Sequence, residues 1–76
     1  MSPKLPHVSG REVIRAFERA GWSVLPKRGK GDHIILHKPG VAVILSVPDH
    51  DELGPGLLRK LIRLSGLTVD EFTALL

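Results

Sequence analysis

A chain of 76 residues has room for one domain, and its 42% hydrophobic and 25% charged residues are typical of a folded globular protein. The absence of cysteine excludes disulfide scaffolds, thiol catalysis and cysteine-ligated zinc. A net charge of +3 favours an anionic partner such as nucleic acid, and because no segment has the length or character of a membrane span or a signal peptide, we expect a cytoplasmic protein.

The N-terminal third of the chain predicts a tail and a helix. Residues 1–8 contain two prolines, which disfavour regular structure, so we expect a flexible tail. Ser9 then has the character of a helix N-cap, and Glu12 three residues later completes a capping box. Apolar side chains recur at helical spacing up to Gly21, a residue suited to the end of a helix. This pattern predicts a helix over residues 10–20.

Three apolar segments separated by turn signals predict strands over residues 22–27, 32–38 and 41–47. If Pro39-Gly40 is a two-residue hairpin loop, Lys38 pairs with Val41. In that register His33 faces Ser46, and alternate side chains form one uniformly apolar face that covers the core. Both strand histidines then stand on the opposite, open face of the sheet.

The C-terminal third predicts two further helices. Gly54-Pro55-Gly56 is expected to open a helix that Gly66 ends. Thr68 and Glu71 form a second capping box at the start of a short C-terminal helix. Helices gathered on one face of a three-stranded antiparallel sheet make an α+β two-layer sandwich, and we expect residues 1–76 to form a single such domain.

His33 is the strongest candidate for chemistry. It begins the second predicted strand, which is a rigid platform, and follows the basic, glycine-containing turn of residues 27–31. A histidine with an ordinary pKa of about 6.5 can accept the proton of an RNA 2′-OH group or protonate the leaving 5′ oxygen. The alternative, favoured by the local sequence alone, is an exposed strand histidine without a role.

Basic side chains near this strand and on the second helix are candidate contacts to RNA phosphates: Lys27, Arg28, Lys30, Lys38 and Arg59. The turn of residues 27–31 lacks the Walker spacing and a following helix, which argues against a nucleotide-binding loop. A solvated turn is an equal alternative to a phosphate contact. Arg59 shares a helix face with Lys60 and Arg63, for which a solvated surface is the favoured alternative.

The remaining histidines are weaker candidates. His37 lies on the same predicted sheet face as His33, and we interpret it as a surface residue or a phosphate contact, since two strand histidines without a third ligand make a weak metal site. His50, in the loop after the third strand, either approaches the end of the sheet or has a structural role. We expect neither a metal nor another cofactor.

Six segments together carry a family resemblance through their order and spacing: Ser9–Ile14, Ala20–Trp22, Arg28–His33, Val47–His50, Gly56–Ile62 and Gly66–Thr68. From about Ser9 to Phe72 the chain resembles the HicA toxins, small mRNA interferases of type II toxin–antitoxin systems in bacteria and archaea. The resemblance implies a double-stranded-RNA-binding-domain-like fold, consistent with the predicted element order, and cleavage of mRNA without a cofactor.

The resemblance also implies specific residues and a partner. The family's catalytic histidine ends a Gly-Ser-His motif, which corresponds here to Gly31-Asp32-His33, so His33 is the implied general acid or base. Asp32 replaces the family's serine; an aspartate would orient or charge the histidine and would also add negative charge near an RNA phosphate. The implied partner is a HicB antitoxin, which forms a hetero-oligomer with the toxin and covers the sheet face around His33, Ile35 and Ile44.

The sequence therefore predicts a toxin that cleaves single-stranded or translating mRNA. Two other interpretations stay open from the residues themselves. The first is a non-catalytic RNA-binding module that uses the same basic surface. The second is a domain whose function is to bind a protein partner.

Overall fold

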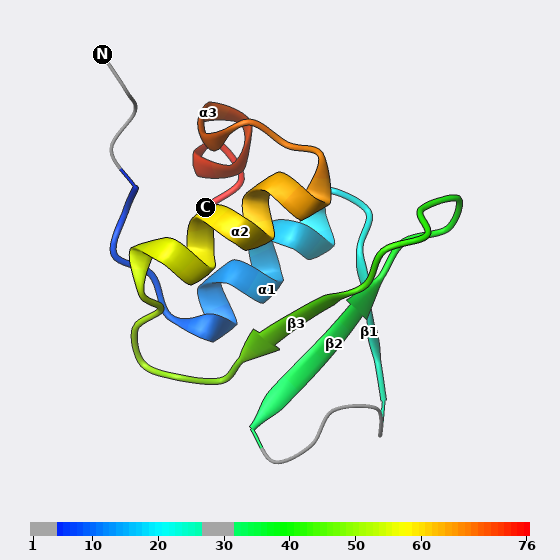
Figure 1. Ribbon diagram of the computed structural model, residues 1–76, viewed down its shortest axis with the longest axis horizontal. Helices are drawn as coiled ribbons and strands as arrows, with labels where there is room; N and C mark the ends of the chain where they lie inside the picture. The colour runs from blue at the N-terminus through cyan, green and yellow to red at the C-terminus, as the bar shows by residue number, and fades with distance from the viewer. Residues whose placement is uncertain (1–4, 27–31) are drawn as a thin grey trace.

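The computed structural model describes residues 5–26 and 32–76. The elements are, in order, α1 (Gly10–Arg19), β1 (Ser23–Leu25), β2 (His33–His37), β3 (Leu45–Pro48), α2 (Pro55–Ser65) and α3 (Val69–Thr73). The strands form one antiparallel sheet in the order β1-β2-β3, and α1 and α2 pack together against it (Figure 1). This confirms the predicted α+β, double-stranded-RNA-binding-domain-like order α-β-β-β-α with a short C-terminal helix.

The helix ends follow the capping signals in the sequence. The Ser9 hydroxyl accepts a hydrogen bond from the Glu12 backbone N–H, and the Glu12 carboxylate accepts one from the Ser9 N–H. α1 ends at Arg19, one residue earlier than predicted, and Gly21 follows with φ of +99°, a left-handed conformation that glycine adopts without strain. The same reciprocal capping box joins Thr68 and Glu71 at the start of α3.

The connection between β2 and β3 differs from the prediction. Val41 N–H donates to the Lys38 carbonyl across a turn in which Gly40 has φ of +81°. The Pro39-Gly40 turn is therefore formed as predicted, but Pro39, with φ locked near −65°, excludes the type I′ and II′ turns whose twist matches that of paired strands, so the turn does not continue into a tight hairpin. Residues 41–44 therefore lie outside the sheet, and β3 begins only at Leu45.

The register moves by two residues as a result. His33 is opposite Pro48 and not Ser46, and Leu36 is opposite Leu45. Because side chains alternate between the two faces, a shift of two keeps Leu36 and Leu45 on the core face, whereas Val43, also expected there opposite Leu36, lies before β3 and is exposed. Leu36 and Leu45 are fully buried, as the pattern predicted, while His33 is exposed.

One hydrophobic core joins the two layers. Phe17 of α1 lies at its centre, in edge contact with Trp22 and tilted against Phe72 of α3, with ring centroids 6.4 and 5.2 Å away. Trp22 is therefore a core residue, as expected. The chain before α1 also contributes, because Val8 is buried and its carbonyl accepts from the Leu53 N–H. Leu5 and Val8 thus pack on the core, while residues 1–4 of the expected tail lie outside the described residues.

The described helices are all short. Across residues 5–26 and 32–76, none has both the length and the apolar character required to cross a membrane.

Candidate functional site

The antiparallel pairing of β2 and β3 creates the candidate site. The start of β2 lies beside the end of β3, so the residue before β2 meets the loop that follows β3 (Figure 1). This brings Asp32, His33 and His50 together, and we call these three residues the two-histidine cluster. All three side chains are about half exposed, at 53%, 49% and 55%. The cluster is therefore open to a large ligand at the molecular surface.

A single carboxylate contacts both histidines of the cluster. Asp32 Oδ2 lies 2.6 Å from Nε2 of His50, a hydrogen bond at the short end of the usual range. Asp32 Oδ1 lies 3.5 Å from Nδ1 of His33, close enough for charge attraction but long for a hydrogen bond. The two imidazole rings are thus arranged around the two oxygens of one side chain.

The backbone holds the His50 loop in place from two sides. Asp49 N–H donates to the Asp32 carbonyl over 2.7 Å, and Gly10 N–H, at the start of α1, donates to the His50 carbonyl over 2.9 Å. Gly10 permits this approach, because a Cβ there would lie 2.1 Å from the carbonyl oxygen of Pro48. Arg11 adds an ion pair with Asp49 at 3.5 Å. The position of His50 is therefore set by the fold.

The electrostatics of the cluster favour an ionised aspartate. The hydrogen bond with His50 is the main cause that lowers the pKa of Asp32 below its ordinary value. A backbone hydrogen bond lowers this pKa further, desolvation opposes the two, and the charges of His50 and His33 contribute less than either. Asp32 is consequently negative near neutral pH and only accepts hydrogen bonds there.

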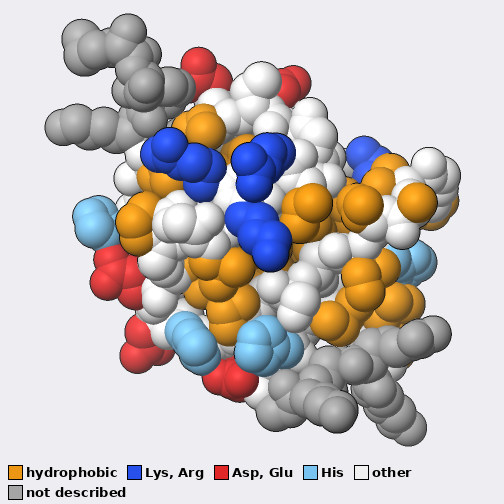
Figure 2. Space-filling model, in the orientation of Figure 1, with side chains coloured by type: hydrophobic (Ala, Val, Ile, Leu, Met, Phe, Trp, Pro, Cys, Tyr) orange, Lys and Arg blue, Asp and Glu red, His pale blue; other side chains and the backbone are white. Residues whose placement is uncertain are grey.

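His33 also lines a groove between β3 and α2, which we call the α2 groove. The groove has a volume of about 350 Å³, and Lys60 is the cation among its lining residues in the described part of the chain. The rest of the lining is mostly apolar: Ile44, Ser46, Pro48, Leu57, Leu61 and Leu64. Lysine and arginine side chains gather over α2 on the same face of the molecule, and histidines lie at its edge (Figure 2). Lys60 is thus a described cation that shares this groove with His33.

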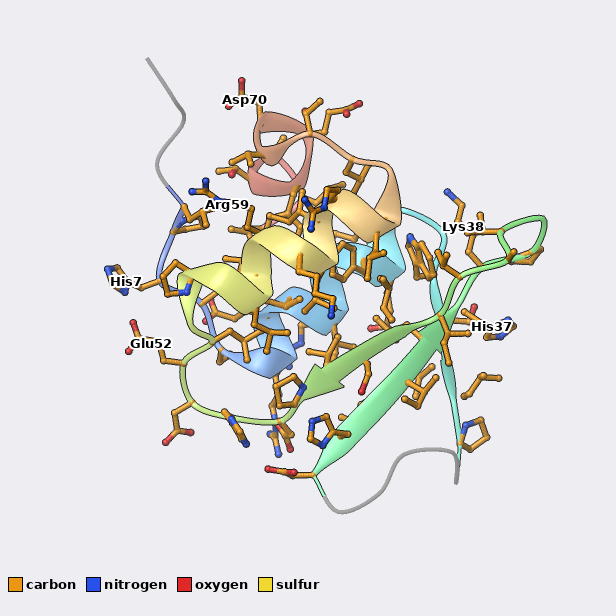
Figure 3. All side chains as sticks on the ribbon, in the orientation of Figure 1. His7, His37, Lys38, Glu52, Arg59 and Asp70 are labelled. Atoms are coloured by element: carbon orange, nitrogen blue, oxygen red, sulfur yellow. The ribbon has the colours of Figure 1, made fainter. Side chains whose placement is uncertain are left out.

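The other predicted basic residues lie apart from His33. Lys38 follows the far end of β2, roughly 16 Å along the strand at about 3.3 Å per residue, and its stem packs over Gly21. Arg59 lines a different hollow of about 680 Å³ with His7 and Glu52, which form an ion pair. Figure 3 shows Lys38 and Arg59 toward opposite ends of the molecule. Three more predicted contacts lie outside the described residues: Lys27, Arg28 and Lys30.

His37 does not join the cluster. It ends β2, opposite Ser23 of β1, and is partly buried. The described residues contain no group of three or more His, Asp or Glu side chains arranged to hold a metal ion.

Comparison with known families agrees with this architecture. Residues 10–67 of the 76-residue chain match the family model described as the HicA toxin of bacterial toxin–antitoxin systems. This match spans the two-histidine cluster, both strands that build it, and α2. A comparison with curated proteins gave no significant match.

Proposed function

The chain belongs to the HicA toxin family, and on this basis we propose that it is a ribonuclease that cleaves mRNA with His33 as a general acid or base. The observation that carries this proposal is the position of His33. It is exposed at the start of a paired strand, it contacts a carboxylate, and it opens onto the α2 groove beside Lys60. Such a histidine combines a fixed position, access to a polymer and a proton that is mobile near neutral pH.

The proposed reaction uses the nucleophile that RNA itself carries. Removal of the 2′-OH proton lets the 2′ oxygen attack the adjacent phosphorus, and the bond from phosphorus to the 5′ oxygen breaks. The leaving 5′ oxygen takes up a proton. The products are one fragment that ends in a 2′,3′-cyclic phosphate and another that begins with a 5′-OH group. His33 supplies one of these two proton transfers.

Cations around the scissile phosphate stabilise the extra negative charge of the transition state. Lys60 lies in the same groove as His33 and is the first candidate for this role. Lys27, Arg28 and Lys30 immediately precede His33 in the chain, and we retain them as proposed phosphate contacts. Lys38 and Arg59, if they bind RNA, contact it away from the cleaved bond.

The proposed protein partner is a HicB-type antitoxin that forms a hetero-oligomer with this chain and covers the site. The α2 groove offers apolar area for this contact, since Ile44 is 57% exposed there and lies with His33 in the same lining. Because the proposed substrate is mRNA, the proposed location is the cytoplasm.

The direct test is cleavage of a defined single-stranded RNA by the purified chain, with analysis of the new ends. We expect 2′,3′-cyclic phosphate and 5′-OH ends from the parent, and loss of cleavage by at least about 100-fold in His33→Ala. His7→Ala is the matched control, since His7 is an exposed histidine paired with Glu52 away from the cluster. Salt-sensitive RNA binding without cleavage would favour the non-catalytic RNA-binding alternative.

A further inference from the structure

We propose that His50 is the second proton-transfer group of this site, acting as the general base while His33 acts as the general acid, and that Asp32 positions both. The inference rests on the proposed ribonuclease function and adds to it the residue that completes the acid–base pair. It is carried by the contacts of one carboxylate with two imidazoles that lie 17 residues apart in the chain.

The hydrogen bond between Asp32 and His50 determines which nitrogen of His50 is free. An ionised carboxylate only accepts hydrogen bonds, so Nε2 of His50 must carry the hydrogen and donate it to Asp32. In the neutral ring the lone pair is then on Nδ1. A histidine whose N–H is held by a carboxylate, with its other nitrogen unprotonated, has the arrangement that a general base requires.

His33 is suited to the opposite role. Its Nδ1 lies 3.5 Å from the other oxygen of Asp32, so Nδ1 is the ring nitrogen on the side of the carboxylate. The opposite ring nitrogen, Nε2, then carries a proton that can be transferred to a leaving oxygen. His33 also lines the α2 groove with Lys60, which places the acid next to the cation that binds phosphate in the proposed reaction.

The elements around the cluster contribute few other charges. In the described part of the chain these are Arg11 of α1 and Asp49 of the loop, which pair with each other, Asp51 and Glu52 in the same loop, and Lys60 of α2; Glu52 pairs with His7. The Arg11–Asp49 pair has no net charge. Asp32 therefore remains the negative group in contact with both rings, and Lys60 is the cation on the side of the groove.

The proposed step balances as follows. Nδ1 of His50 takes the proton of the 2′-OH group as the bond from the 2′ oxygen to phosphorus forms. The bond from phosphorus to the 5′ oxygen breaks, and Nε2 of His33 transfers its proton to that oxygen. His50 ends protonated and His33 ends neutral, and exchange of protons with water restores the starting forms.

A sulfur substitution at the leaving position separates the two roles. In a substrate whose bridging 5′ oxygen is replaced by sulfur, the leaving group departs without protonation, so loss of a general acid has little effect. We expect His33→Ala to be at least about 100-fold slow on the oxygen substrate and close to the parent on the sulfur substrate. His50→Ala should be slow by a similar factor on both substrates, because the 2′-OH must still lose its proton.

The pH dependence gives a second readout. A general base must be unprotonated, so its variant loses the rise of kcat/KM with increasing pH, whereas a variant of the acid loses the fall at higher pH. We expect His50→Ala to lose the rising limb and His7→Ala to keep the whole bell-shaped profile. Asp32→Asn, which keeps the side-chain volume but removes the charge, should slow cleavage of the oxygen substrate and leave its products unchanged.

The outcomes separate this inference from the proposed function. Suppose that folded His50→Ala cleaves the oxygen substrate within about threefold of the parent rate, and that His33→Ala does not. This result would overturn the role of His50 and leave the proposed ribonuclease function intact. Rescue of His50→Ala by sulfur, without rescue of His33→Ala, would overturn the assignment of base and acid. A parent protein that cleaves neither substrate would refute the ribonuclease proposal itself. Circular dichroism and thermal unfolding of each variant establish that it is folded.

Discussion

The imidazole of His50 and the carboxylate of Asp32 are joined by a 2.6 Å hydrogen bond across 18 positions of the chain. The contact exists because β2 and β3 are antiparallel, with Pro48 opposite His33. The residue that precedes one strand and the loop that follows the other therefore meet at one edge of the sheet. His33 lies at the same edge, within reach of the same carboxylate.

A side chain at Gly10 should displace the His50 loop. The Cβ of Gly10→Ala would lie 2.1 Å from the Pro48 carbonyl oxygen, and the Gly10 N–H is the donor to the His50 carbonyl. We expect a loss of about 1–3 kcal/mol in the free energy of unfolding, because backbone atoms on both sides must move. Chemical denaturation measures this loss, and RNA cleavage should fall with it.

Gly56→Ala is the matched control for Gly10→Ala. Gly56 lies in the first turn of α2, where an added Cβ has nothing within 4 Å. There, alanine should stabilise the chain by up to about 1 kcal/mol, since glycine is the weaker helix former. Equal effects of the two substitutions would contradict the close packing of α1 against the loop.

Removal of the Lys60 charge should weaken RNA binding near the cleaved bond. Lys60→Ala removes the described cation of the α2 groove, and the slope of log affinity against log salt concentration should decrease by about 0.7–1. Arg15→Ala removes the same charge from an exposed position on α1 and serves as the control. Fluorescence anisotropy with a single-stranded RNA at several salt concentrations measures both, and identical slopes for both variants would count against the role of Lys60.

Asp32 should make folding stability sensitive to acid. Its pKa is lowered in the folded chain from its ordinary value of 3.8, mainly by the hydrogen bond with His50. A lowered pKa contributes stability that is fully present above the unfolded value and is lost as the pH falls through the folded value. Between pH 5 and strongly acidic pH, the melting temperature of Asp32→Asn should therefore fall less than that of the parent.

The measurement for this prediction is thermal unfolding followed by circular dichroism across that pH range. Asp51→Asn, which removes an exposed carboxylate from the same loop as His50, is the control for a general change in net charge. An acid response of Asp32→Asn as steep as that of the parent would show that the contact with His50 does not contribute to stability.

Local sequence signals predicted the order of helices and strands, because each signal depends on interactions between residues a few positions apart. Ser9 and Glu12 form their capping box with no help from distant parts of the chain, and the alternation in β2 identified Leu36 as a core residue. The register of β3 was wrong because it was inferred from a tight hairpin at Pro39-Gly40. The locked φ of Pro39 is a local signal against the type I′ and II′ turns that a tight hairpin favours.

The composition of the candidate site was harder to predict. His33 was identified from the motif that it ends, but its contact with His50 through Asp32 depends on the register and on the close approach at Gly10, neither of which is a local property. The same reason explains why the sequence indicated Arg59 as a phosphate contact, whereas Lys60 is the residue that shares a groove with His33. The two are adjacent in α2 and face different hollows, and only the packing of the helix determines which one lies with His33.

The central claim is that this chain cleaves mRNA through His33, and paired induction in bacterial cells tests it most directly. The parent, His33→Ala and His7→Ala are expressed to equal levels, and growth and the integrity of a defined mRNA are followed by northern blot. We expect growth arrest and mRNA fragments with the parent and with His7→Ala, and normal growth with intact mRNA for His33→Ala. Equal arrest and fragmentation by the parent and a folded His33→Ala would contradict the account.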